Sequence, residues 1–85
     1  MTTLYLLNRR HTAGQLTDLL AAGDTVVLCG DAVQCWQQQW PRQVRVHVLS
    51  EDALARNLTA PATQAGIDYP ELVQLCGSHA RVIAW

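Results

Sequence analysis

The sequence predicts an α/β domain: three layers, α/β/α, around a mostly parallel sheet. Two observations predict it. Short continuous apolar runs recur along the chain, as strands buried on both faces require. Between them lie segments whose apolar residues recur at helical spacing. At 85 residues the chain has room for one hydrophobic core, so we expect a single domain over residues 1–85.

Four segments are predicted as strands: residues 4–7, 25–29, 44–49 and 81–85. The first two and the last are largely continuous apolar runs. The third alternates Val44, Val46 and Val48 with Arg45 and His47, which means that one of its faces is less buried. We therefore expect the third strand to lie near a sheet edge.

Four helices are predicted between the strands. They begin at residues whose side chains can cap a helix N-terminus, namely Thr12, Asp31, Ser50 and Asp68. Glu71 completes a capping box with Asp68, as Gln15 does with Thr12. Gly23, Pro41 and Gly77 are expected to end three of the helices, and residues 59–66 to form a loop. This order of elements predicts a doubly wound, flavodoxin-like sheet with right-handed crossovers.

The composition excludes several functional classes. Six arginines, no lysine and seven acidic residues give a net charge of −1, and Arg9–Arg10 is the only adjacent basic pair, so direct nucleic-acid binding is not expected. No apolar run reaches the roughly 20 residues that span a bilayer, and the first residues do not resemble a signal peptide. An odd number of cysteines, three, indicates a reduced, cytoplasmic protein. Because only 15% of the residues are charged, we expect part of the surface to be buried against another chain.

Cys29 is the candidate nucleophile. It ends the second strand just before a helix, where functional groups gather in parallel α/β sheets and where a helix N-terminus lowers a thiol pKa. However, Asp31 places a negative charge at the same helix start, and cysteine is a common small apolar residue in buried strands. We therefore interpret Cys29 as structural and expect no catalytic residue in this chain.

The other polar groups indicate no cofactor or metal. Cys35 is interpreted as structural, and Cys76 with His79 supplies too few ligands for a metal. His11 and His47 have no nucleophile at a recognisable spacing. The segment from Cys29 to Ala32 has one glycine and an acid where a phosphate would bind, so no nucleotide or flavin is expected.

The tryptophans are the candidate interface residues. Trp36 and Trp40 stand one turn apart on a predicted helix, and Trp85 closes an apolar strand. Either all three pack in the core, or they anchor a partner, since tryptophan is enriched at binding hot spots.

Four segments together resemble the TusB/DsrH family and span nearly the whole chain. They are residues 4–9, residues 23–33 from Gly-Asp to Asp-Ala-Val, residues 48–58 with an acid–x–x–Ala–Arg pattern, and residues 67–85 from Ile-Asp-Tyr to Ala-Trp. Asn57 stands where the family often has glycine, which is compatible with a left-handed helix exit.

The resemblance implies a subunit of a hetero-oligomer with TusC-like and TusD-like chains. In such a complex, sulfur travels as a persulfide on the TusD-like subunit, passes to a TusE-like acceptor and ends in the 2-thiouridine at a tRNA wobble position. The DsrH branch, tied to sulfur oxidation, carries a cysteine in the first helix. The corresponding place here is near Leu16, and that helix contains no cysteine. This departure favours the TusB branch.

Three functions remain open from the sequence. The first is a non-catalytic subunit of the relay that serves tRNA thiolation. The second is a sulfur carrier with Cys29 as the persulfide residue. The third is a stand-alone homo-oligomeric binding module.

Overall fold

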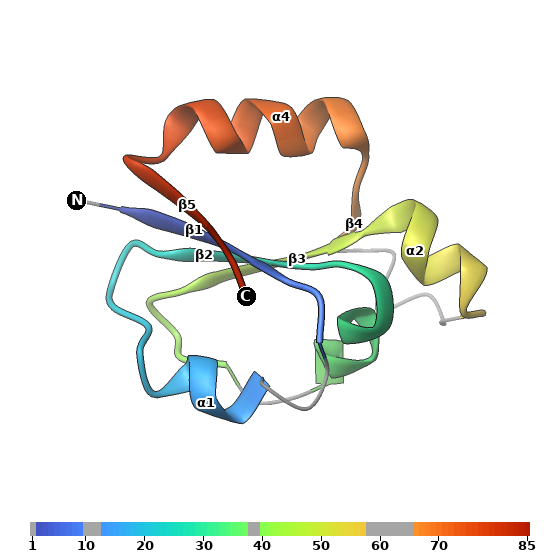
Figure 1. The fold of residues 1–85 in the computed structure, drawn as a ribbon, viewed down its shortest axis with the longest axis horizontal. Helices are drawn as coiled ribbons and strands as arrows, with labels where there is room; N and C mark the ends of the chain where they lie inside the picture. Colours follow the sequence, from blue (N-terminus) through green and yellow to red (C-terminus); the bar gives the residue numbers. More distant parts are fainter. Residues whose placement is uncertain (1, 10–12, 38–39, 58–65) are drawn as a thin grey trace.

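The computed structural model describes residues 2–9, 13–37, 40–57 and 66–85. It contains a five-stranded sheet in the order β4-β3-β2-β1-β5, with every pairing parallel. The strands are β1 (Thr3–Leu7), β2 (Thr25–Leu28), β3 (Arg45–Leu49), β4 (Gly66–Ile67) and β5 (Arg81–Ala84). The predicted α/β class and parallel sheet are confirmed (Figure 1).

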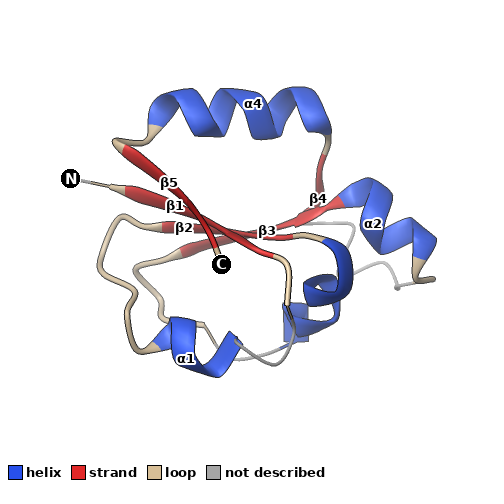
Figure 2. Cartoon of the chain, in the orientation of Figure 1, coloured by secondary structure: helices blue, strands red, loops and turns tan. Residues whose placement is uncertain are grey.

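The helices cover both faces of the sheet. They are α1 (Ala13–Thr17), a 3-10 helix η2 (Gly30–Gln37), α2 (Ser50–Ala55) and α4 (Tyr69–Ser78). Helices α1 and η2 lie on one face, and α4 crosses the other face from the β4 edge to the β5 edge (Figure 2). The chain thus winds outward from β1 to β4 on one side and returns to β5 over the other. No described helix is long and apolar enough to span a bilayer.

The main core lies on the face covered by α1 and η2. Strand residues that alternate toward this face meet buried side chains of the helices. The strands contribute Tyr5, Leu7, Val26, Leu28 and Val48, and the helices contribute Ala13, Leu16, Ala32, Val33 and Ala53. Burial of this continuous apolar set supplies most of the hydrophobic stabilisation.

The core under α4 is much smaller. Its buried members are Leu4, Val27 and Ile67, and half-buried residues of the sheet and of α4 pack around them. No residue of α4 itself is buried. The helix therefore covers the sheet while its own outer and lateral surfaces stay open.

The start of α4 follows the capping box that the sequence predicts. The Asp68 carboxylate accepts a hydrogen bond from the Glu71 N–H at 2.9 Å, and the Glu71 carboxylate accepts one from the Asp68 N–H at 3.3 Å. Pro70 lies in the first turn, where a missing N–H has no cost. The helix continues through Gly77 to Ser78, so the expected stop at Gly77 was wrong by one residue.

A buried carboxylate shortens the first helix. Asp24 is 5% exposed and accepts hydrogen bonds from the Ala21 N–H at 2.9 Å and the Thr3 N–H at 3.1 Å. Because Asp24 binds the Ala21 N–H, the chain leaves the helix early, and α1 ends at Thr17 and not near Gly23. The expected cap, Thr12, lies outside the described residues.

Gly23 lies beyond the helix, in the turn before β2, and has a left-handed conformation. Its φ is +89°, and a Cβ there would lie 3.3 Å from the Thr2 methyl group. Asn57, after α2, also has a positive φ of 55°, as its comparison with family glycines predicted.

The sequence did not predict β4. Two residues are too few to show a strand period, and Gly66 falls at the end of the predicted loop of residues 59–66, of which 59–65 lie outside the described residues. In the β3–β4 register, Val48 and Leu49 face Gly66 and Ile67, so the start of β3 has no described neighbour on that side. The sequence predicted that the third strand lies near a sheet edge. This prediction holds for the first half of β3, which β4 does not cover.

Candidate functional site

Cys29 lies at the carboxyl end of β2, on the sheet face covered by α4. Its N–H continues the strand ladder by donating to the Leu7 carbonyl at 2.9 Å. Its side chain is half-buried and packs on the Leu4–Val27–Ile67 cluster together with Leu72, Leu75 and Cys76. The sequence therefore placed Cys29 correctly at the end of the strand.

The charge near this thiol opposes ionisation. The Asp52 carboxylate, from α2, accepts a hydrogen bond of 2.7 Å from the Gly30 N–H, at the start of η2. Burial, the Asp52 charge and Cys76 together raise the pKa of Cys29 to about 11. A helix N-terminus that would favour a thiolate is thus already bound to an anion. At neutral pH the thiol is protonated and a weak nucleophile.

The acid responsible is Asp52, where the sequence indicated Asp31. Asp31 lies in the first turn of η2 and is exposed. Asp52 is far away in the sequence, and the parallel order β2–β3 brings the start of α2 beside the end of β2. The sequence signal for this contact is weak, because an acid in a first helical turn is usually explained by the helix dipole alone.

Tyr69 belongs to the same group. Its ring is 48% exposed at the start of α4. The Asp52 carboxylate, with smaller effects of burial, Glu51 and Cys29, raises the pKa of the Tyr69 hydroxyl. The Asp52 charge therefore acts on both Cys29 and Tyr69.

His79 has a structural role. Its Nδ1 lies 2.7 Å from the Leu75 carbonyl oxygen, and its Nε2 lies 2.7 Å from the Thr25 hydroxyl. Since a carbonyl only accepts, Nδ1 donates to Leu75, and Nε2 is hydrogen-bonded to the Thr25 hydroxyl. The ring fastens the end of α4 to the start of β2. Among the described residues, no group of three metal-ligating side chains is present.

The three tryptophans all contact the main core. Trp36 and Trp40 are half-buried, and the Trp40 indole N–H donates to the Cys35 carbonyl at 3.2 Å. The Trp85 ring packs edge-on against Tyr5, with centroids 6.3 Å apart and planes at 84°. The Trp85 Nε1 is buried with no hydrogen-bond partner in the described structure. Their role as partner anchors stays a prediction.

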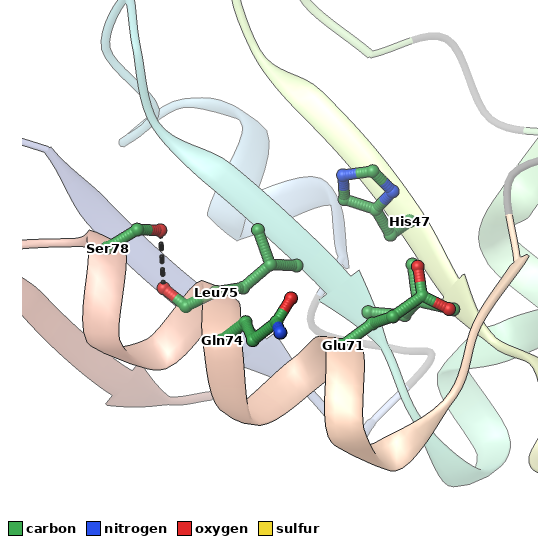
Figure 3. A pocket seen from close by; sticks show the side chains of 6 residues that line it. His47, Glu71, Gln74, Leu75 and Ser78 are labelled. Atoms are coloured by element: carbon green, nitrogen blue, oxygen red, sulfur yellow. Dashed lines mark hydrogen bonds between the residues drawn. The ribbon is translucent and has the colours of Figure 1, made fainter.

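A shallow cavity of about 280 Å³ lies between α4 and the sheet. His47 points toward it from β3, and Glu71, Gln74, Leu75 and Ser78 line it from α4, with Ile67 of β4 (Figure 3). Two of its polar groups are already engaged, because Glu71 is part of the capping box and the Ser78 hydroxyl donates to the Leu75 carbonyl. The cavity shows that α4 leaves the β3 side of the sheet incompletely covered.

Large apolar side chains are exposed on α2, α4 and β5, and the sequence did not single these out. Leu54 of α2 is 66% exposed, Val73 of α4 69% and Val82 of β5 43%, in addition to Tyr69. The helical spacing of Val73 and Leu54 resembles that of core residues, which is why the sequence does not distinguish them. Their exposure is consistent with the expected partner surface.

A family of DsrH-like proteins matches residues 8–82 of this chain. The chain belongs to this family. Protein TusB of Escherichia coli strain SMS-3-5 / SECEC is 30% identical over 95 residues, a match that covers 94% of this chain and 100% of the relative. Protein TusB of E. coli strains O81 (ED1a) and O6:K15:H31 (536 / UPEC) matches to the same extent. The family resemblance inferred from the four segments is confirmed.

The fold of this DsrH-like protein also resembles a solved structure. The solution NMR structure of protein Tm0979 from Thermotoga maritima superposes with a TM-score of 0.70. The match covers 89% of this chain and 92% of Tm0979, at 22% identity. At that identity the likeness supports the fold.

Proposed function

We propose that this DsrH-like protein is a non-catalytic subunit of a heteromeric sulfur-relay complex that serves 2-thiolation of the tRNA wobble uridine. Family membership and the full-length match to TusB support the relay. The observation that carries the non-catalytic role is the Asp52 carboxylate, which is bound to the Gly30 N–H beside the half-buried Cys29; burial and this charge raise the pKa of the thiol. A persulfide carrier needs a thiolate to accept sulfur, and this site disfavours one.

The proposed partners are TusC-like and TusD-like chains, with sulfur passing to a TusE-like acceptor in the cytoplasm. The net charge of −1 supports tRNA binding by another protein. In this proposal, the relatives dock on the corner formed by α2 and α4, which displays Leu54 of α2 and, near Glu51 and Asp52, Tyr69 of α4. Exposed apolar residues beside acids suit a partner patch of apolar and basic residues.

The function is tested by co-expressing the chain with its TusC-like and TusD-like relatives and measuring wobble thiolation. Cys29→Ser should assemble and leave the rate nearly unchanged, while omission of the chain should abolish it. Had Cys29 carried the sulfur, the rate would fall by more than about a hundredfold with assembly intact. That result would replace the proposal by the persulfide-carrier alternative.

The docking corner is tested with charged substitutions. Leu54→Asp should weaken assembly by roughly 2 kcal/mol, about thirtyfold, if the side chain fills an interface pocket. Leu19→Asp is the matched control, because Leu19 is 55% exposed but belongs to the α1 region on the other face. Equal loss in both variants, or in neither, would contradict the assigned corner.

A further inference from the structure

The two edges of the sheet differ in how they are protected. The outer strand β4 has two residues, so it offers little backbone for pairing. The outer strand β5 has four residues, Arg81–Ala84, and no described segment pairs with its free side. Proteins normally protect such an edge with a proline, a bulge or inward-pointing charges. In β5 the sequence Arg-Val-Ile-Ala supplies one charge, at its first residue.

The backbone hydrogen bonds show which groups of β5 are open. The Arg81 N–H donates to the Thr2 carbonyl at 3.3 Å, and the Trp85 N–H donates to the Leu6 carbonyl at 2.8 Å. Residues 81, 83 and 85 therefore direct their backbone groups toward β1. Because successive residues of a strand alternate, Val82 and Ala84 direct their N–H and C=O groups outward.

Both sides of this edge are apolar. On the α4 face, Val82 is 43% exposed and adjoins the exposed Ala84. On the other face, Ile83 and Trp85 pack partly against the main core. Glu71, Gln74 and Ser78 line the cavity, so they lie on the flank of α4 that faces β3. Successive residues of an α-helix are about 100° apart around its axis, and this spacing puts Val73 on the opposite flank. That flank faces the β5 side and leaves Val73 69% exposed.

We propose that a second copy of this chain pairs with β5 in antiparallel orientation, centred on Ile83, so that two sheets become one. In this register Val82 faces Ala84 of the second copy, and both exchange their outward N–H and C=O groups. The pairing uses every open backbone group of β5, four hydrogen bonds in all by the antiparallel pattern. A register centred on Val82 would instead place Ala84 opposite Ala80 of the second copy. The Ala80 N–H already donates to the Thr2 carbonyl, so it is not open for this pairing.

The side chains of β5 are complementary to themselves in this register. The larger Val82 lies over the smaller Ala84 of the second copy on the α4 face. On the other face Arg81 lies opposite Trp85 of the second copy, so the single cation of each strand meets an aromatic ring and not its own counterpart. The two-fold axis is perpendicular to the sheet, which places both α4 helices on one face with their Val73 flanks toward each other. A second copy therefore fits this edge in shape and in charge.

The proposal is tested by sedimentation velocity on the purified chain over a wide concentration range. The wild-type chain should form a dimer, and Val82→Lys should weaken it at least about tenfold by placing two ammonium groups near the pairing. Leu19→Lys, an exposed apolar residue away from β5, should dimerise like the wild type. A monomeric wild type, or a dimer that tolerates Val82→Lys, would overturn the proposal.

Two further variants separate loss of pairing from loss of folding. Ala84→Pro removes an outward N–H that the monomer does not use, so it should keep the native circular dichroism spectrum and lose the dimer. Ile83→Cys should form a symmetric disulfide with oxidised glutathione, because facing Cα atoms at this kind of position are about 4.5 Å apart. Arg81→Cys is its matched control and should not cross-link beyond the wild-type chain, since the two Arg81 positions lie far apart in this register.

The same variants distinguish this proposal from the proposed relay function. Val82→Lys should still assemble with the TusC-like and TusD-like relatives through the α2–α4 corner. A pure chain that is monomeric, together with loss of heteromer in Val82→Lys, would instead assign the β5 edge to a relative. If sulfur-relay activity did not depend on this chain but the chain still dimerised, the relay proposal would be wrong and the β5 pairing would be unaffected.

Discussion

The two faces of the sheet differ in what their residues do. The face under α1 and η2 buries a continuous set of branched and aromatic side chains, from Tyr5 to Val48. The face under α4 buries Leu4, Val27 and Ile67 and leaves α4 without a buried residue. The half-buried cysteines, the cavity and most of the exposed large apolar residues all lie on or around this second face. The first face stabilises the fold, and the second is available to partners.

The difference shows how a small domain can combine stability and binding. In a chain of 85 residues the buried area is limited, so exposed apolar area on one face must be balanced by dense packing on the other. The polar contacts of the α4 face, the capping box and the His79–Thr25 hydrogen bond, hold α4 in place where apolar packing is thin.

The largest effect is expected from truncating the dense face. Leu28→Ala removes a fully buried side chain from the main core and should lower the free energy of unfolding by about 2–5 kcal/mol. Leu75→Ala, the matched change on the half-buried α4 face, should cost roughly half as much or less. Urea denaturation of both variants measures the difference. Equal costs would mean that the two faces contribute alike.

The next effect concerns the reactivity of Cys29. With a pKa of about 11, its alkylation by iodoacetamide at pH 8 should be roughly a hundredfold slower than that of an unperturbed thiol. Asp52→Asn removes the neighbouring charge, lowers the pKa and should accelerate alkylation. Asp31→Asn, an exposed acid in the same helical start, is the control and should change nothing. Mass spectrometry of the Cys29 peptide reports the rate.

The same shift predicts how stability depends on pH. The folded pKa of Cys29 is raised above its unfolded value, so the folded chain keeps its proton longer. The contribution to stability is therefore fully present below pH 9 and is lost as the pH rises toward 11. Cys29→Ser should flatten the denaturation profile in that window. An unchanged slope would contradict the raised pKa.

The smallest effect is expected at the start of α4. Asp68→Ala removes the cap of the Glu71 N–H and should cost about 1 kcal/mol. Asp68→Ser restores a capping oxygen and should recover most of that loss. A larger cost would show that α4 contributes more to stability than its exposed surface suggests.

The sequence predicted what depends on local chemistry. Continuous apolar runs located three of the four longer strands and apolar–polar alternation located β3, while Asp68 with Glu71 located the start of α4 to the residue. It missed what depends on contacts distant in sequence. The end of α1 is set by the Asp24 carboxylate, and β4 exists because Val48 and Leu49 offer it a neighbour.

The candidate site was predicted only in part. The place of Cys29 at the end of β2 follows from its strand. Its raised pKa comes first from burial and then from Asp52 and Cys76, which belong to two other elements and meet Cys29 only in the folded chain. Exposure of Val73 and Val82 also depends on how far α4 covers the sheet, and no local pattern encodes that.

The place of β1 between β2 and β5 has a consequence for biosynthesis. β1 pairs with β2, about twenty residues later, and with β5, where Thr3 faces Arg81. Until the ribosome has released the last of these residues, one side of β1 carries unpaired amides and carbonyls in a nascent chain. Such a chain is open to mispairing, so early capture by a chaperone should raise its soluble yield. Completion of the sheet then waits on the pairing of β1 with β5, two strands that are far apart in sequence, which makes that step the slow one in folding.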